Sequence, residues 1–204
     1  MMKNNNFLTI LINESYNYLF KKKNKIILDK SENINLKLTQ NESIKHSTAL
    51  HTVWLLNLKR LYNLVKQEID LENYHFIDIG CGNGIPLIYA NKNFRFKSFS
   101  GIDLISDYIN ITKKNIESSL RSNSINVIQA DAANFILGDK SYFVFMYNPF
   151  DEVIMEKFMI NNYKHLIKNN SVIAYSNYNQ LNIIKKFTNN IQEIKKFKLA
   201  CCYF

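Results

Sequence analysis

Glycine and proline are scarce in this chain of 204 residues, which contains only five glycines and two prolines. Hydrophobic residues make up 47% of the chain and aromatic residues 13%, so the composition argues against a disordered polypeptide. A chain of this length fits one domain and can bury a substantial core. Because glycines are so few, the clustering of three of them at Gly80, Gly82 and Gly84 carries unusual weight.

Cysteine is also rare, with Cys81, Cys201 and Cys202 as the three examples. Three cysteines support neither a disulfide framework nor a four-ligand zinc site, and no His/Cys/Asp cluster has metal-ligand spacing. The longest early apolar run, Phe7–Ile12, is too short for a signal peptide or a membrane span. We therefore expect a cytoplasmic protein without a metal and without a membrane partner.

The net charge of +9 is unevenly distributed. Residues 51–150 hold ten Lys/Arg against nine Asp/Glu, whereas each flank holds eight lysines against four acids. The densest points are Lys21–Lys23 and Lys195–Lys196. Two interpretations stay open, namely a solvated basic surface and contact with a polyanion such as nucleic acid.

The order of apolar segments predicts an α/β fold. Residues 1–45 resemble an irregular or weakly helical extension, and helical spacing of apolar residues begins at Leu50. Strands and helices then alternate, which predicts a mostly parallel sheet covered by helices on both faces. We assign residues 46–204 to this domain. The predicted elements after the first helix are strand Tyr74–Ile79, helix Ile85–Asn91, strand Phe96–Asp103, a helix capped by Ser106, strands Asn126–Ala130 and Tyr142–Tyr147, helix Glu152–Ile167, strand Ser171–Tyr175, helix Leu181–Phe187 and one or two edge strands.

The first strand runs into the segment Asp78-Ile-Gly-Cys-Gly-Asn-Gly84. A glycine turn between a strand and a helix brings backbone N–H groups close to a nucleotide-like ligand. A dinucleotide fingerprint requires glycine at position 85, where this chain has Ile85, and no Gly-Lys-Ser/Thr follows for a P-loop. The spacing therefore favours a different nucleotide-like cofactor.

Two later aspartates also end strands. Asp103 ends the second strand, where a carboxylate can accept hydrogen bonds from ribose hydroxyls. Asp131 ends the third strand, where it can accept a hydrogen bond from an adenine amine. Together with Asp78, these carboxylates are expected at one edge of the sheet.

At this point the chain resembles the class I S-adenosylmethionine-dependent methyltransferases over roughly residues 46–180. The likeness implies a Rossmann-like fold and S-adenosyl-L-methionine as cofactor, with S-adenosyl-L-homocysteine as product. It implies that Asp78 holds the amino-acid end of the cofactor, Asp103 the ribose and Asp131 the adenine. The full set of cofactor-binding residues that it implies is Asp78, Gly80, Cys81, Gly82, Gly84, Asp103, Leu104, Asp131, Ala132 and Asn148.

The fourth strand ends in Tyr147-Asn148-Pro149-Phe150. This segment resembles the Asp/Asn-Pro-Pro-Tyr/Phe motif of methyltransferases that act on nitrogen, although only one proline is present. It resembles more closely small bacterial class I methyltransferases with Asn-Pro-Phe. The likeness implies catalytic roles for Asn148, Pro149 and Phe150, and substrate contacts for Tyr147. In the same group a histidine stands next to the helix that packs near the cofactor mouth, which implies that His46 or His51 contacts the cofactor or the substrate.

The sequence therefore predicts a cytoplasmic methyltransferase that methylates nitrogen on a protein side chain or a small molecule. A nucleic-acid base, reached through the basic flanks, is the alternative acceptor. A non-catalytic binding module on the same fold is a second alternative. The acceptor, the oligomeric state, a lid role for residues 1–45 and the completeness of a C-terminal hairpin all remain open.

The expected ribose contact of Asp103 can be tested by substitution. Asp103→Ala should weaken binding of S-adenosylhomocysteine by about 1–3 kcal/mol, because hydrogen bonds to the carboxylate are lost. Calorimetry on the folded variant measures this change, and unaltered affinity would contradict the assignment.

Overall fold

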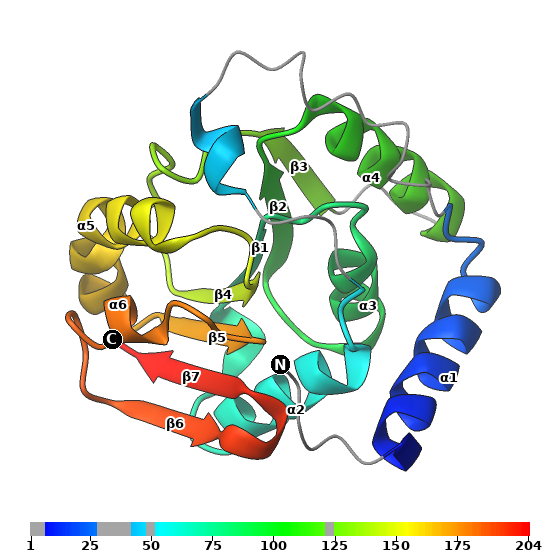
Figure 1. Cartoon of the computed structure of the whole chain (residues 1–204), viewed down its shortest axis with the longest axis horizontal. Helices are drawn as coiled ribbons and strands as arrows, with labels where there is room; N and C mark the ends of the chain where they lie inside the picture. Colours follow the sequence, from blue (N-terminus) through cyan, green and yellow to red (C-terminus); the bar gives the residue numbers. More distant parts are fainter. Residues whose placement is uncertain (1–6, 28–41, 48–51, 121–124) are drawn as a thin grey trace.

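The computed structural model describes residues 7–27, 42–47, 52–120 and 125–204. Seven strands form one sheet in the order β3-β2-β1-β4-β5-β7-β6 (Figure 1). The strands are β1 (His75–Ile79), β2 (Ser98–Asp103), β3 (Ile125–Gln129), β4 (Tyr142–Tyr147), β5 (Val172–Ser176), β6 (Ile191–Ile194) and β7 (Leu199–Tyr203). The α-helices are α1 (Phe7–Lys23), α2 (Leu55–Lys66), α3 (Ile85–Asn93), α4 (Ser106–Ser119), α5 (Glu152–Lys168) and α6 (Leu181–Ile184). Short 3₁₀ turns are η3 (Glu42–His46), η4 (Leu71–Asn73) and η5 (Lys195–Phe197).

The first five strands are parallel, as the alternation of strands and helices predicts. The sheet grows outward from β1, which pairs with β2 on one side and with β4 on the other. The strand order thus reverses between β1 and β4, and ligands of such sheets bind beyond the carboxyl ends at this point. Asp78 lies on β1 beside this reversal, in register with Gly101 of β2 and Phe145 of β4.

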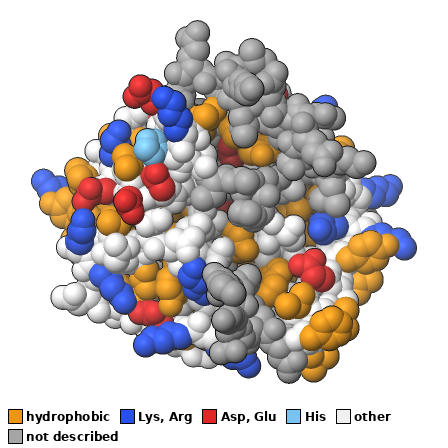
Figure 2. Space-filling model, viewed as in Figure 1, with side chains coloured by type: hydrophobic (Ala, Val, Ile, Leu, Met, Phe, Trp, Pro, Cys, Tyr) orange, Lys and Arg blue, Asp and Glu red, His pale blue; other side chains and the backbone are white. Residues whose placement is uncertain are grey.

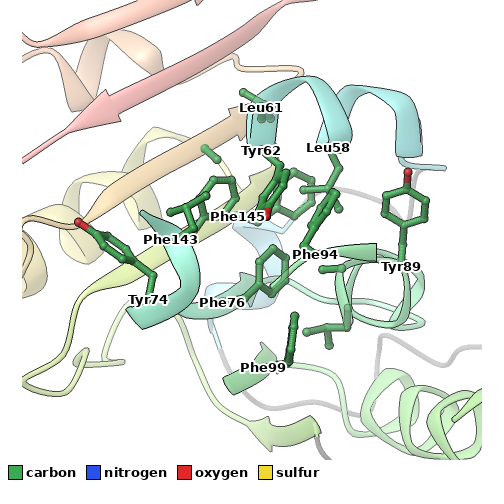
Figure 3. Packing of buried hydrophobic residues seen from close by; sticks show 14 of the residues in the cluster. Leu58, Leu61, Tyr62, Tyr74, Phe76, Tyr89, Phe94, Phe99, Phe143 and Phe145 are labelled. Atoms are coloured by element: carbon green, nitrogen blue, oxygen red, sulfur yellow. The ribbon is translucent and has the colours of Figure 1, made fainter. Parts of the chain in front are cut away.

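One face of the sheet carries an aromatic core beneath α2, α3 and α4. Successive side chains of a strand alternate between faces, so Phe76, Phe143 and Phe145 all point toward these helices (Figure 3). The ring of Tyr62 from α2 stacks on Phe94 with centroids 3.9 Å apart. The opposite face packs against α5 and α6 through apolar side chains of the same strands. Both faces of the sheet are therefore covered.

The C-terminal hairpin is complete. The short C-terminal segment led us to expect one or two edge strands, but β7 is inserted antiparallel between β5 and β6 and is buried along its whole length. Cys201 faces the aromatic core and Cys202 the opposite core. The connection stays short because η5 is followed by Lys198 in the left-handed conformation, with φ at +55°. Strands of four and five residues then suffice to close the sheet.

The N-terminal segment contains one regular helix. The sequence predicted an extension that is partly irregular or helical, and residues 7–23 of it form α1. Hydrogen bonds of Asn17 hold helix α1 against the segment before α2. The side-chain amide of Asn17 donates to Val53 O, and its side-chain oxygen accepts from Leu55 N–H. Tertiary contacts of this kind stabilise a helix that local propensity alone does not. The division into residues 1–45 and 46–204 stays a prediction.

Two predicted helix starts are wrong. The helix expected from Leu50 begins at Leu55, and Trp54 before it donates its indole N–H to Glu14 instead of lying on the helix face. Ser106 is the first residue of α4 rather than its cap. The carboxylate of Asp103 accepts the N–H of Ile105 at this point, so a strand-end residue takes part of the capping role. None of the helices in the described residues has the length and apolar content that crossing a bilayer requires.

The contact between Gly84 and α4 predicts a stability effect. Gly84 has φ at +76°, and a Cβ there would lie 2.6 Å from Thr112 Cγ2. Gly84→Ala should lower the free energy of unfolding by about 1–3 kcal/mol, because it adds both backbone strain and a clash. Denaturant unfolding measures this loss. In a Thr112→Ser background, which keeps the hydroxyl but removes the methyl group, the loss should be smaller; an equal loss in both backgrounds contradicts the clash.

Candidate functional site

The glycine turn after β1 is packed tightly against its neighbours. Gly80 has φ at +77°, and a Cβ at this position would lie only 2.5 Å from Pro149 Cβ. The N–H groups of Gly80 and Cys81 both donate to Ile102 O at 2.9 Å, which holds the turn against the end of β2. The turn therefore touches the segments that follow β4 and end β2, and glycine at position 80 is what permits this approach.

Asp78 is the most deeply buried carboxylate of the site, with 2% of its surface exposed. Its Oδ2 atom is buried and has no hydrogen-bond partner among the described residues. Burial, and then the nearby charge of Asp103, raise the pKa of the Asp78 carboxyl well above its usual range. A buried carboxylate in this state indicates a place for a ligand that brings a cationic or hydrogen-bond-donating group.

Asp103 is held by the backbone on both sides. Its Oδ2 accepts the N–H of Gly82 and its Oδ1 accepts the N–H of Ile105, each at 2.9 Å. Burial raises the pKa of this carboxyl, and the backbone hydrogen bonds oppose that rise. Each carboxylate oxygen has two lone pairs, so both can still accept a ligand hydroxyl.

Asp131 links the end of β3 to the N-terminal segment. Its Oδ2 accepts from Ser43 Oγ at 2.8 Å, and its Oδ1 accepts the N–H of Ala133 at 2.9 Å. Ser43 belongs to η3, so a residue far away in the sequence closes over the third strand end. The carboxylate therefore shapes the local turn and also anchors the segment above it.

These residues line one cavity of about 280 Å³. Three strand-end carboxylates, Asp78, Asp103 and Asp131, meet there although they are 25 or more residues apart in sequence. The predicted site residues that line this cavity are Asp78, Gly80, Cys81, Gly82, Asp103, Leu104, Asp131, Ala132, Tyr147, Pro149 and Phe150. Burial, and then the nearby carboxylates of Asp103 and Asp78, raise the pKa of the Cys81 thiol, so it stays protonated at neutral pH.

Gly84 and Asn148 lie outside the cavity lining. Gly84 instead precedes α3 and allows the approach of Thr112, whose hydroxyl donates to Gly82 O at 2.6 Å. Asn148 has φ at +44°, and its Oδ1 accepts from the hydroxyl of buried Tyr175 at 3.0 Å. The amide oxygen that the resemblance assigns to a substrate amine thus has an internal partner. Its catalytic role stays a prediction.

His46 lies beside the cavity rather than in it. Its Nδ1 is 2.6 Å from Asp151 Oδ2, and its carbonyl accepts the N–H of Asp151. The other carboxylate oxygen of Asp151 caps α5 by accepting from Val153 N–H. The His46–Asp151 pair therefore ties η3 to the segment after β4. His51 lies outside the described residues, so its predicted substrate contact is not located.

Sequence reasoning missed a group of cavity residues that precede the domain core. Ser43, Ser47, Thr52 and Val53 line the cavity, as does Lys21 from the last turn of α1. No local motif marks them, because long-range contacts such as that of Ser43 with Asp131 bring them to the cavity. Helix α4 also contributes Tyr108. The described residues contain no group of three or more His, Cys, Asp or Glu side chains that could hold a metal ion.

Comparisons with known proteins point to one family. Residues 76–169 match a family described as a methyltransferase domain. A segment of 83 residues is 28% identical to a fatty-acid O-methyltransferase of Mycolicibacterium smegmatis, and it covers 41% of this chain but only 29% of that enzyme.

Solved structures share the fold at low sequence identity. The human methyltransferase 10 domain containing protein is 14% identical with a TM-score of 0.61, over 95% of this chain and 96% of that one. An RNA methyltransferase from Salinibacter ruber in complex with S-adenosyl-L-homocysteine is 14% identical with a TM-score of 0.52, over 76% of this chain and 92% of that one.

The buried state of Asp78 generates a pH prediction. Because its pKa is raised in the folded protein, the stability that its bound proton contributes is present at low pH and is lost as pH rises through the folded pKa. Asp78→Asn cannot ionise, so the ligand-free variant should be more stable than the parent at pH about 8, with a difference that shrinks as pH falls. The same variant should bind S-adenosylhomocysteine roughly tenfold or more weakly, through the loss of a charged hydrogen bond.

Thermal unfolding across pH and calorimetry measure the two effects of Asp78→Asn separately. Asp107→Asn on the exposed side of α4 is the matched control and should change neither. A parallel pH profile for parent and Asp78→Asn contradicts the buried-carboxylate assignment.

Proposed function

We propose that this chain, with its class I S-adenosylmethionine-dependent methyltransferase domain, methylates a nitrogen acceptor bound beside the end of β4. The acceptor is a small molecule or a single protein side chain. The observation that carries the proposal is the meeting of three strand-end carboxylates around the glycine turn in one cavity, with Asp78 Oδ2 lacking a partner among the described residues.

The cavity residues fit the parts of S-adenosylmethionine. The unpartnered oxygen of Asp78 suits the ammonium group of the amino-acid end, and the glycine turn allows close approach of the chain. Asp103, already oriented by two backbone N–H groups, suits the ribose hydroxyls. Asp131 suits the adenine amine, which would share or replace its bond from Ser43. When bound, this cofactor supplies a methyl group on a sulfonium that is a good leaving group.

The acceptor side of the cavity is mostly apolar. Pro149, Phe150 and Ile154 line the cavity after β4, and Tyr147 at the end of β4 lines it as well. Exclusion of water by these side chains favours the uncharged form of an amine, which is the form that attacks. Burial, and then the charge of Glu14, raise the pKa of Tyr147, so its hydroxyl stays protonated and available for hydrogen bonding with the acceptor. The chain's residues thus bind and align the acceptor rather than activate it strongly.

Residues from the N-terminal segment narrow the cavity. Ser43 and Ser47 from the η3 region and Val53 before α2 complete its lining. This enclosure favours a small molecule or one extended side chain over a base within folded nucleic acid. The oxygen acceptor in the name of the bacterial relative is not carried over, because the matched segment spans only 29% of that enzyme.

Methyl transfer can be followed with methyl-labelled S-adenosylmethionine and cell extract separated into small molecules, proteins and nucleic acids. We expect alkali-stable label in the small-molecule or protein fraction, as N-methyl groups resist hydrolysis. Label in nucleic acid, or alkali-labile label on carboxyl groups, would overturn the proposed acceptor. If no fraction leads to production of S-adenosylhomocysteine, the proposal that the chain catalyses methyl transfer is wrong.

A substitution at Tyr147 tests the acceptor side. Tyr147→Phe should lower the rate of transfer by roughly tenfold, the equivalent of one hydrogen bond, while S-adenosylhomocysteine affinity stays within about twofold. Tyr142→Phe at the opposite end of β4 is the matched control and should leave transfer unchanged. Equal effects of both variants would contradict a role of Tyr147 at the acceptor.

A further inference from the structure

Helix α1 has its polar and apolar faces reversed relative to a helix that packs on a core. Its buried residues are Asn13 and Asn17. Its large apolar side chains are exposed, with exposed fractions from 42% to 78%. Figure 2 shows hydrophobic side chains gathered along the rim of the molecule where Figure 1 draws α1. The exposed apolar residues of this helix are Phe7, Leu8, Ile10, Leu11, Ile12, Tyr18 and Leu19.

The exposed apolar residues lie on one side of the helix, at both of its ends, with the exposed Ser15 between them. Phe7, Leu11 and Tyr18 follow one another at i, i+4 and i+11, and so do Leu8, Ile12 and Leu19. Positions with these spacings share a helix face, and the two rows lie next to each other. We call these six residues the apolar face of α1. Isolated exposed apolar residues need no explanation, whereas a larger patch marks an interaction site.

The apolar face is not needed to hold α1 in place. Asn17 makes two hydrogen bonds to the backbone before α2, at 2.8 Å to Val53 O and 3.1 Å to Leu55 N. The hydroxyls of Tyr16 and Tyr89 share a hydrogen bond of 2.9 Å, and Phe20 packs edge-on against the Tyr89 ring. The helix is thus anchored by Asn17 and by the rings of Tyr16 and Phe20, which leaves the apolar face directed outward.

Charge identifies the kind of partner. The last turn of α1 carries Lys21, Lys22 and Lys23, and Glu14 is the one acidic residue in the sequence of this helix. Glu14 accepts a hydrogen bond from Trp54. A helix with an apolar face and a cluster of lysines suits the interface of a membrane that contains anionic lipids.

A second copy of the chain fits this face less well. If two apolar faces packed in parallel, their lysine clusters would meet. If they packed antiparallel, each cluster would meet the first turn of the other helix, which contains no acidic residue. Neither arrangement offers the lysines a carboxylate partner, whereas an anionic lipid surface does.

We propose that α1 binds the surface of an anionic lipid bilayer, with its apolar face inserted at the level of the headgroups and Lys22 and Lys23 against lipid phosphates. The sequence-based expectation of no membrane partner rested on the lack of a spanning or targeting segment, and a helix that lies on the bilayer requires neither. Lys21 lines the cofactor cavity, so the bound bilayer would lie beside that cavity.

Co-flotation of the full chain with vesicles tests this proposal. We expect binding to phosphatidylcholine vesicles that contain about one third phosphatidylglycerol, little binding to phosphatidylcholine alone, and loss of binding at high salt. Leu11→Asn combined with Leu19→Asn should weaken binding roughly tenfold or more, because apolar burial drives insertion. The matched control, Ile160→Asn with Ile167→Asn, changes two exposed apolar residues of α5 and should bind like the parent.

A second variant reverses the charge of two exposed lysines and leaves the apolar residues of α1 in place, so it tests the proposal without the apolar substitutions. Lys22→Glu with Lys23→Glu should abolish binding to the anionic vesicles, whereas Lys113→Glu with Lys114→Glu on α4 makes the same charge change and should have little effect. Failure of the parent to bind anionic vesicles, or unchanged binding by both α1 variants, overturns the proposal. The parent could instead sediment as a dimer, fail to bind vesicles, and become a monomer when Leu11 and Leu19 are replaced. That result assigns the apolar face to a second copy of the chain and also overturns the proposal.

Discussion

The close contact between Gly80 and Pro149 is the constraint on which the site depends. It joins the turn after β1 to the segment after β4, at the point where the strand order reverses. The first of these segments carries the residues proposed for the cofactor, and the second carries those proposed for the acceptor. Because a Cβ at position 80 would lie 2.5 Å from Pro149 Cβ, the distance between the two halves depends on glycine there. Gly84 and Thr112 make a similar contact behind the turn, so the loop is supported on two sides.

The electrostatics of the cavity follow from this packing. Asp78 and Asp103 are buried close enough that the charge of Asp103 raises the pKa of Asp78, and desolvation raises both. Backbone N–H groups stabilise Asp103, whereas Asp78 Oδ2 lacks such a donor among the described residues. A site of this kind is destabilising until a ligand brings the missing donor, which is a common property of binding sites. Ligand binding and stability are therefore coupled through Asp78.

The N-terminal segment connects the two proposals. Its η3 turn reaches the cavity through Ser43 on Asp131, and beside the cavity His46 pairs with Asp151, so the turn joins the third strand end to the start of α5. Helix α1 precedes it and lies on the outside of the domain, with Lys21 reaching the same cavity. A surface that binds α1 would thus lie close to the residues that enclose the cavity proposed for the cofactor. Both the narrowing of the cavity and the outward apolar face depend on how this segment docks, mainly through asparagine and tyrosine side chains.

Local sequence determined the strand–helix order, the glycine turn and the three strand-end aspartates, because alternating apolar patterns and glycine requirements act over a few residues. The prediction of β4 at Tyr142–Tyr147 is confirmed, and the parallel sheet follows from the alternation. Only the tertiary structure decided that Asn148 bonds to Tyr175, that β7 is an interior strand, and that α1 is a helix which buries asparagines. These features depend on partners 23 or more residues away in sequence, such as Leu199 opposite Ser176, Tyr175 with Asn148 and Val53 with Asn17. No local pattern encodes such pairings, since they arise from packing across the sheet and its edges.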